Sequence, residues 1–204
     1  MTAALPPPVS GTPDVPWAGG ELTPSVRCVL APNPGPMTLD GTNTYVLAEP
    51  GSSHAVVVDP GPDDLDHLDR VVHELARYDQ QATMVVLTHG HADHSAGAPR
   101  LARRVGCPVR AVDPRHRLGD EGLADSSRLT VAGLEIGVRA TPGHTADSVC
   151  LHVPADGVLL TGDTVLGRGT TVVAHPDGVL SDYLHSLGQL EAFAAEHPGP
   201  VSYT

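Results

Sequence analysis

Short apolar segments, separated by turn residues, recur along most of the chain. Runs rich in valine, leucine and alanine that end at glycine, proline, asparagine or aspartate are typical of β-strands. Such runs predict strands at residues 26–30, at the end of 39–47, and at 55–58, 84–87, 107–112, 129–131, 134–140, 149–153 and 158–160. One more strand is expected to begin at Val201.

Three segments instead carry apolar residues at the spacing of an α-helix. The first runs from about Leu65 to Tyr78, and Asp64 before it is a suitable N-cap. The second spans 95–105, and the third begins after a cap at Ser181 and ends at 198–200. The apolar stripe of the first helix is Leu68, Val71, Val72 and Leu75, and that of the third is Leu184, Leu187, Leu190 and Phe193.

The order of these elements predicts an α/β sandwich. A helix lies between the strands at 55–58 and 84–87, so these two strands are expected to be parallel, with a right-handed crossover. Tight turns at Gly133 and at 156–157 predict that the later strands are mostly antiparallel. Residues 1–24 are rich in proline and glycine and are expected to form an irregular arm, whereas 25–204 form one domain.

Composition and charge narrow the possible partners. Acidic residues outnumber basic ones by 24 to 12, which gives a formal charge of −12. Such a chain lacks the basic surface of a duplex-DNA-binding protein, although divalent ions would reverse the sign of charge near a metal site. The sequence shows neither a secretion signal nor a membrane span, so a cytoplasmic protein with no membrane partner is expected. The cysteines Cys28, Cys107 and Cys150 are expected to be buried free thiols.

A histidine-rich motif directly follows the predicted strand at 84–87. The segment Thr88-His89-Gly90-His91-Ala92-Asp93-His94 holds three imidazoles and one carboxylate. Zinc and similar metals bind imidazole and carboxylate groups, and a turn after a strand can direct several such groups to one point. The motif therefore predicts a metal site rather than a polar surface turn.

Two later segments repeat the pattern of polar residues after a strand. His144 follows the strand at 134–140, and Asp163 follows the strand at 158–160. Because loops at one edge of a sandwich lie together, these residues are expected to join the first cluster. His116, alone in the irregular stretch 113–127, is expected to be exposed and outside the site.

The six predicted ligands suit two metal ions. Three imidazoles account for one ion with an open position for water, whereas Asp93 and His94 contribute to a second, and Asp163 can bridge. Two ions ~3.5–4 Å apart share a hydroxide that attacks an ester, amide or phosphodiester. Asp93 is expected to orient or deprotonate the water.

These motifs resemble the metallo-β-lactamase superfamily. They are His89-x-His91-x-Asp93-His94, then 142–145 with His144, then Gly162-Asp163. The resemblance implies a four-layer αββα sandwich with a dinuclear site, usually of zinc. It places His89, His91 and His144 on the first metal, Asp93 and His94 on the second, and Asp163 between them. Class B lactamases commonly use a cysteine where Asp163 stands, so antibiotic hydrolysis is disfavoured.

Within the superfamily, the segment 33–45 is similar to the β-lactamase-like protein 2 group. The metazoan member of that group is a mitochondrial endoribonuclease for single-stranded RNA, and bacterial relatives include hydroxyacylglutathione hydrolase-like proteins. The segment is expected either to lie at the mouth of the metal site or to serve only as a compact turn.

One departure from the family pattern concerns the second metal. The pattern ends with a strand and a Gly-His-Gly turn, and this sequence stops where that strand begins. The domain is therefore expected to be incomplete at its C-terminus. The histidines downstream of Asp163 lack the expected context; they are His175, His185 and His197. Full occupancy is predicted at the first metal position and weak or no binding at the second.

The leading hypothesis is a zinc-dependent hydrolase that uses metal-bound hydroxide on a phosphodiester of single-stranded RNA or on a small-molecule thioester. A catalytically weak metal-binding remnant is an alternative, because the last ligand is missing. A redox di-iron protein is a third hypothesis, disfavoured because such relatives generally have glutamate where His91 stands. The sequence does not indicate an oligomeric state.

Overall fold

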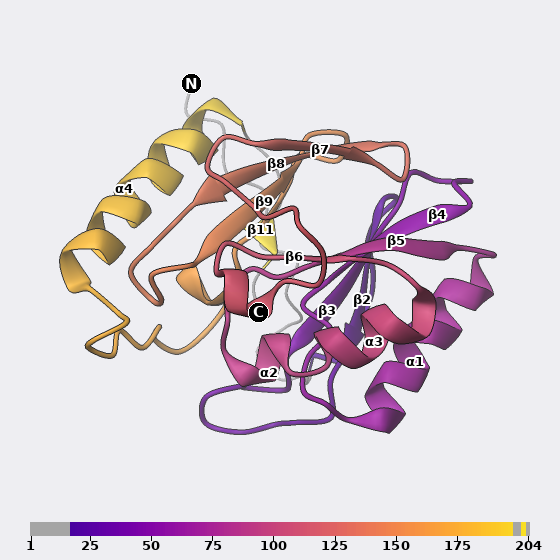
Figure 1. Cartoon of the computed structure of the whole chain (residues 1–204). Helices are drawn as coiled ribbons and strands as arrows, with labels where there is room; N and C mark the ends of the chain where they lie inside the picture. The colour runs from indigo at the N-terminus through magenta and orange to yellow at the C-terminus, as the bar shows by residue number, and fades with distance from the viewer. Residues whose placement is uncertain (1–16, 198–200, 203–204) are drawn as a thin grey trace.

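Two β-sheets face each other and helices cover both outer faces (Figure 1). The computed structural model describes residues 17–197 and 201–202. Helix–sheet–sheet–helix is the order of layers, which confirms the predicted αββα sandwich. No helix in the described part of the chain is both long and apolar enough to span a membrane.

Among the described residues, the first sheet has six strands in sequence order. They are β1 (Gly20–Thr23), β2 (Val26–Leu30), β3 (Asn43–Leu47), β4 (His54–Val58), β5 (Gln81–Val86) and β6 (Val109–Arg110). Helices α1 (Leu65–Arg77), α2 (Ala92–Ser95) and α3 (Ala98–Val105) follow its strands, with α1 and α3 against the outer face. Strands β4 and β5 are parallel and joined by α1, as expected.

The second sheet, as far as the structure describes the chain, has five strands in the order β11-β10-β9-β8-β7. These are β7 (Arg128–Val131), β8 (Leu134–Ala140), β9 (Val149–Val153), β10 (Val158–Leu160) and β11 (Val201–Ser202). Strands β7 to β10 pair antiparallel as predicted, whereas β11 is parallel to β10. Helix α4 (Leu180–Glu196) packs Leu190 and Phe193 on Cys150 and Leu159 of the outer face.

The burial of each strand explains its pattern of apolar and polar residues. All five residues of β3 are buried, because α1 and the other sheet cover the two faces of the first sheet. Strand β8 instead alternates, with Leu134, Ile136 and Val138 in the core between the sheets. The three cysteines are free and buried, as predicted.

The predicted helix at 95–105 is wrong in its first part. It is divided into α2 and α3 around Gly97, whose backbone packs so tightly that an added Cβ would lie 2.9 Å from the Pro62 carbonyl oxygen. The predicted cap at Ser181 is also wrong. Helix α4 begins at Leu180, because the N–H of Val179 donates to the Gly143 carbonyl oxygen. Leu184, expected on the apolar stripe of this helix, is exposed.

Some strand boundaries also differ from the prediction. Strand β1 lies in the segment 1–24 expected to be irregular, and residues 1–16 of that arm are outside the described residues. Its sequence is polar, and it forms because its backbone pairs with β2. Strand β5 begins at Gln81 instead of 84, and the strand expected at 107–112 is reduced to β6.

Candidate metal centre

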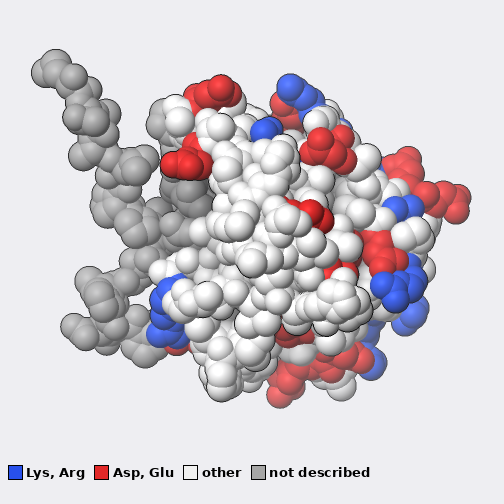
Figure 2. Space-filling model, turned by 90° about the vertical axis from the view of Figure 1, so that its left-hand side faces the viewer, with Lys and Arg blue, Asp and Glu red and all other residues white. Residues whose placement is uncertain are grey.

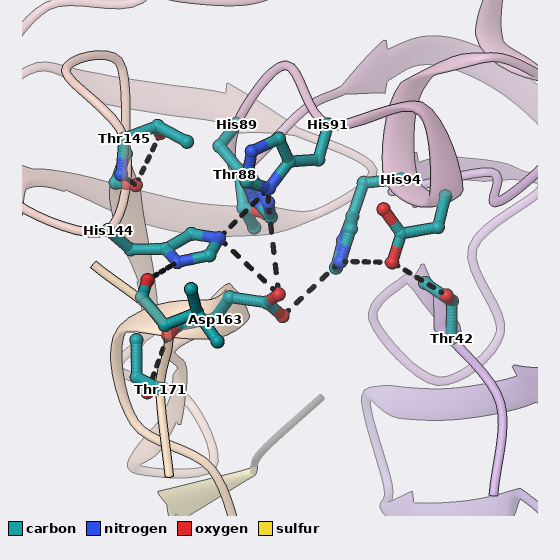
Figure 3. Close-up of polar contacts among 12 residues, drawn as sticks. Thr42, Thr88, His89, His91, His94, His144, Thr145, Asp163 and Thr171 are labelled. Atoms are coloured by element: carbon teal, nitrogen blue, oxygen red, sulfur yellow. Dashed lines mark hydrogen bonds and ion pairs between the residues drawn. The ribbon is translucent and has the colours of Figure 1, made fainter. Parts of the chain in front are cut away.

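The predicted ligands meet at one edge of the sandwich (Figure 3). His89 and His91 lie in the turn after β5, and Asp93 and His94 are in α2. His144 follows β8, and Asp163 lies in a short 3₁₀ helix, η2 (Gly162–Thr164), after β10. Both sheets therefore contribute to the site.

Four of these residues form one compact group. His89, His91, His144 and Asp163 each offer a ligand atom, and these atoms all lie within 4.8 Å of one another. His91 Nδ1 is 3.1 Å from His89 Nε2 and 2.9 Å from His144 Nε2. Asp163 Oδ2 is 3.5 Å from His144 Nε2. Three imidazole nitrogens and one carboxylate oxygen are a donor set that zinc and similar ions bind.

Neighbouring groups set the tautomers of two of these histidines. His144 Nδ1 lies 2.6 Å from the Val172 carbonyl oxygen, to which it can only donate. Thr88 Oγ1 donates to Asp59 Oδ2 at 2.6 Å and so accepts from His89 Nδ1 at 3.1 Å. In both rings Nε2 is left with a lone pair directed at the site. Convergent lone pairs repel one another without a cation between them, so the residues fit a metal ion.

Asp93 and His94 lie beside this group, on the far side of Asp163. His94 Nε2 is 3.3 Å from Asp163 Oδ1 and 3.5 Å from Asp93 Oδ2. The two oxygens of Asp163 thus face different neighbours, Oδ2 toward His144 and Oδ1 toward His94. Asp93 and His94 therefore lie next to Asp163, although they do not belong to the compact group of four.

Asp59, which follows β4 and was not among the predicted ligands, supports the site. Its carboxylate is buried and accepts from the Thr88 N–H at 2.7 Å and the Thr88 hydroxyl at 2.6 Å. It also accepts from His94 Nδ1–H at 2.9 Å, which leaves His94 Nε2 for a ligand. The available signal was its position after a buried strand, which is the same context as His89, His144 and Asp163.

The charges of the metal-free centre follow from these contacts. Burial lowers the pKa of His89 well below its usual value, and the charge of His94 lowers it further. Burial also lowers the pKa of His91, helped by His144. For His94, burial opposes the charged form, but hydrogen bonds to Asp163 and Asp59 outweigh it and raise its pKa. Burial opposes ionisation of Asp163, yet contact with His94 holds its pKa low.

Other histidines lie outside this group. His116, expected to be exposed, is half-buried beside Gly90, where an added Cβ would be 2.5 Å from its Nε2. A larger residue at position 90 would therefore require the His116 ring to move. His175 and His185 are exposed, and His197 stacks on Phe193. Among the described residues, only His89, His91, His144 and Asp163 form a group of this kind.

Two loops form the mouth of the site. A cavity of about 70 Å³ beside His144 and Asp163 lies between residues 36–39 and 166–172. A smaller cavity between the same loops reaches Asp93 and His94. The segment 33–45 therefore does border the centre. The walls of the larger cavity carry apolar side chains, namely Met37, Leu39, Leu166 and Val172. Asp40 and Arg168 join the loops by an ion pair of 2.7 Å.

Comparison with known proteins gives consistent matches. The family model described as "Metallo-beta-lactamase superfamily" matches residues 37–199. The chain is 31% identical over 193 residues to an "Atrochrysone carboxyl ACP thioesterase" of Aspergillus fumigatus, covering 92% of this chain and 59% of that protein. It is 32% identical over 189 residues to a "Beta-lactamase-like protein 2 homolog" of Caenorhabditis elegans, covering 88% and 62%.

Solved structures agree on the fold. The crystal structure of ETHE1 from Myxococcus xanthus is similar with a TM-score of 0.69 and 28% identity, covering 81% of this chain and 68% of that one. The chain spans 57–62% of the length of the first curated relatives that it matches.

Proposed function

This chain belongs to the metallo-beta-lactamase superfamily, and on that premise we propose that it is a zinc-dependent hydrolase of thioesters with an apolar acyl group. The observation that carries the hydrolase proposal is the group of four ligand atoms within 4.8 Å of one another. A divalent metal ion at such a centre lowers the pKa of water and polarises the oxygen of a carbonyl or phosphoryl group.

The residues around the metal position have distinct roles. His89, His91 and His144 would hold the first ion, and Asp163 would face both positions. Asp93 is half-buried at the edge of the smaller cavity, with Oδ2 3.5 Å from the Thr42 hydroxyl that can donate to it. A carboxylate held there can orient an attacking water and accept its proton, and thereby act as the general base.

The mouth supports a thioester as the substrate. Met37 is 65% exposed and Val172 is 43% exposed, and both line the cavity beside His144 and Asp163. Apolar side chains exposed at the entrance can bury an acyl chain while the carbonyl approaches the centre. The Aspergillus fumigatus relative, with its thioesterase name, supports the same substrate class.

Single-stranded RNA is the competing substrate, and the surface supports it less. RNA binding needs cationic side chains along the backbone path. The residues that line the two cavities at the mouth include no lysine or arginine, and nearby Arg168 is paired with Asp40. On the face that carries α4, the basic side chains are few and scattered toward the rim (Figure 2).

The three free, buried thiols support a reducing compartment such as the cytoplasm.

The test compares substrates on one preparation. The zinc-loaded chain is assayed with a medium-chain acyl thioester of N-acetylcysteamine and with a single-stranded oligoribonucleotide. We expect thioester hydrolysis that is abolished by chelation and by His91→Ala, and retained in the matched control His185→Ala on the exposed face of α4. RNA cleavage without thioester hydrolysis would replace the substrate proposal. Metal binding without turnover of either would indicate a remnant. Iron bands in the absorbance spectrum of the protein as purified, before zinc loading, would indicate a redox centre.

A further inference from the structure

His67, a buried histidine outside the metal centre, has a hydrogen-bond partner at each ring nitrogen. His67 in the first turn of α1 has no exposed surface. Its Nδ1 is 3.3 Å from Arg70 NH2, which can only donate, so Nδ1 accepts and Nε2 carries the proton. Burial, with the charge of Arg70, lowers the pKa of His67 to about 4, so the ring is neutral near pH 7.

Thr44 connects His67 with the turn that holds Asp59. The His67 Nε2–H donates to Thr44 Oγ1 at 2.8 Å, and the Thr44 hydroxyl donates to the Asp59 carbonyl at 2.7 Å. The same ring packs on Gly61, where an added Cβ would lie 3.0 Å from Nε2. One imidazole and one hydroxyl thus hold the turn 59–61 from its outer side.

This turn adopts a conformation that needs such support. Asp59 has φ of +48° and Gly61 has φ of +82°, and the first value is unusual for a residue with a side chain. The turn is also joined to the metal-binding segment through its backbone, because the Gly61 N–H donates to the His94 carbonyl at 3.1 Å. Through its side chain, Asp59 orients both His94 and Thr88.

We propose that Thr44 and His67 are positioning residues of the metal centre. They hold the turn 59–61 so that the Asp59 carboxylate directs His94 Nε2 into the site and fixes the Thr88 hydroxyl that orients His89. The inference rests on the metal-binding part of the proposed function and not on its substrate. Groups that orient metal ligands typically change metal affinity by 10–100-fold, so a contact one step further out is expected to change it by about tenfold.

Zinc affinity of the full chain tests the inference. The metal-free protein is titrated with Zn²⁺ against a chromophoric chelator, and its melting temperature is measured in the presence of chelator. Thr44→Val removes the hydroxyl and keeps the shape, whereas Thr44→Ser keeps the hydroxyl. We expect about tenfold weaker zinc binding in Thr44→Val and wild-type affinity in Thr44→Ser. The Co²⁺-substituted absorption spectrum should shift only in the valine variant, since the ligand geometry changes.

If Thr44 contributes only to packing, the valine variant should lose stability without losing zinc affinity. A lower melting temperature of metal-free Thr44→Val, with zinc affinity within twofold of wild type, would overturn the inference. If Thr44→Val does not fold, the pair His67→Gln and His67→Leu takes its place, because glutamine retains an N–H donor and leucine does not; equal affinities in that pair would also overturn it. Zinc binding by the wild type without thioester turnover would refute the proposed substrate and leave this inference intact.

Discussion

Replacing Asp59 by asparagine should weaken the metal centre although Asp59 is not one of the proposed ligands. The carboxylate accepts from three donors, namely the N–H and hydroxyl of Thr88 and Nδ1–H of His94. An asparagine of the same shape has one acceptor oxygen and one NH₂ group. At least one of the three donors would therefore face another donor in a site with no exposed surface.

The size of the effect follows from these contacts. A buried donor left without an acceptor costs ~1–3 kcal/mol, and the remaining bonds lose the extra strength of a charged acceptor. Together these terms predict a loss of ~2–4 kcal/mol in the free energy of unfolding of the metal-free protein. Zinc affinity is expected to fall by about 10–100-fold, because the Thr88 hydroxyl no longer orients His89, a proposed ligand of the tightly bound ion.

Chemical denaturation of the metal-free protein measures the first quantity, and competitive zinc titration measures the second. The matched control is Asp63→Asn. Asp63 is exposed and pairs with Arg100 on the surface, so its neutralisation should leave zinc affinity unchanged. Wild-type zinc affinity in Asp59→Asn would refute the argument that the Asp59 contacts orient the ligands.

Three further predictions concern metal content, pH and the mouth. Elemental analysis of the 204-residue chain should give one tightly bound zinc, with His91→Ala losing it; two fully occupied zincs in the wild type would contradict the expected weak second position. The pKa of His67 is about 4 in the folded protein against a usual 6.5, so the unfolded chain takes up a proton first as the pH falls. Stability should therefore decrease between about pH 6.5 and 4, by up to ~3 kcal/mol, in denaturant titrations, and His67→Gln should reduce this slope; equal slopes in both proteins would contradict the assignment. Met37→Ser should raise KM for an acyl thioester about fivefold with little change in kcat, since the side chain loses ~1 kcal/mol of apolar contact; an unchanged KM would argue against acyl binding at the mouth.

The sequence by itself determined the elements and most of the candidate centre. Alternation and apolar runs located the strands from β2 to β10 because neighbouring positions in a strand experience the two faces of its sheet. The repeated placement of polar residues after strands singled out His89, His144 and Asp163, because strand ends of a sandwich meet at one edge. These signals are local, or depend only on the topology that local signals predict.

Contacts between distant segments decided the rest. Asp59 follows β4 like many turn residues, and only its approach to Thr88 and His94 makes it part of the support of the site. Helices α2 and α3 separate where Gly97 passes Pro62, and β1 exists because β2 offers it a backbone partner. For Asp59 and Gly97 the partner lies about 30 residues or more away in the sequence, and for β1 it is the next strand of the same hairpin. In each case the stabilising contact lies outside the segment, so no pattern within the segment itself could reveal it.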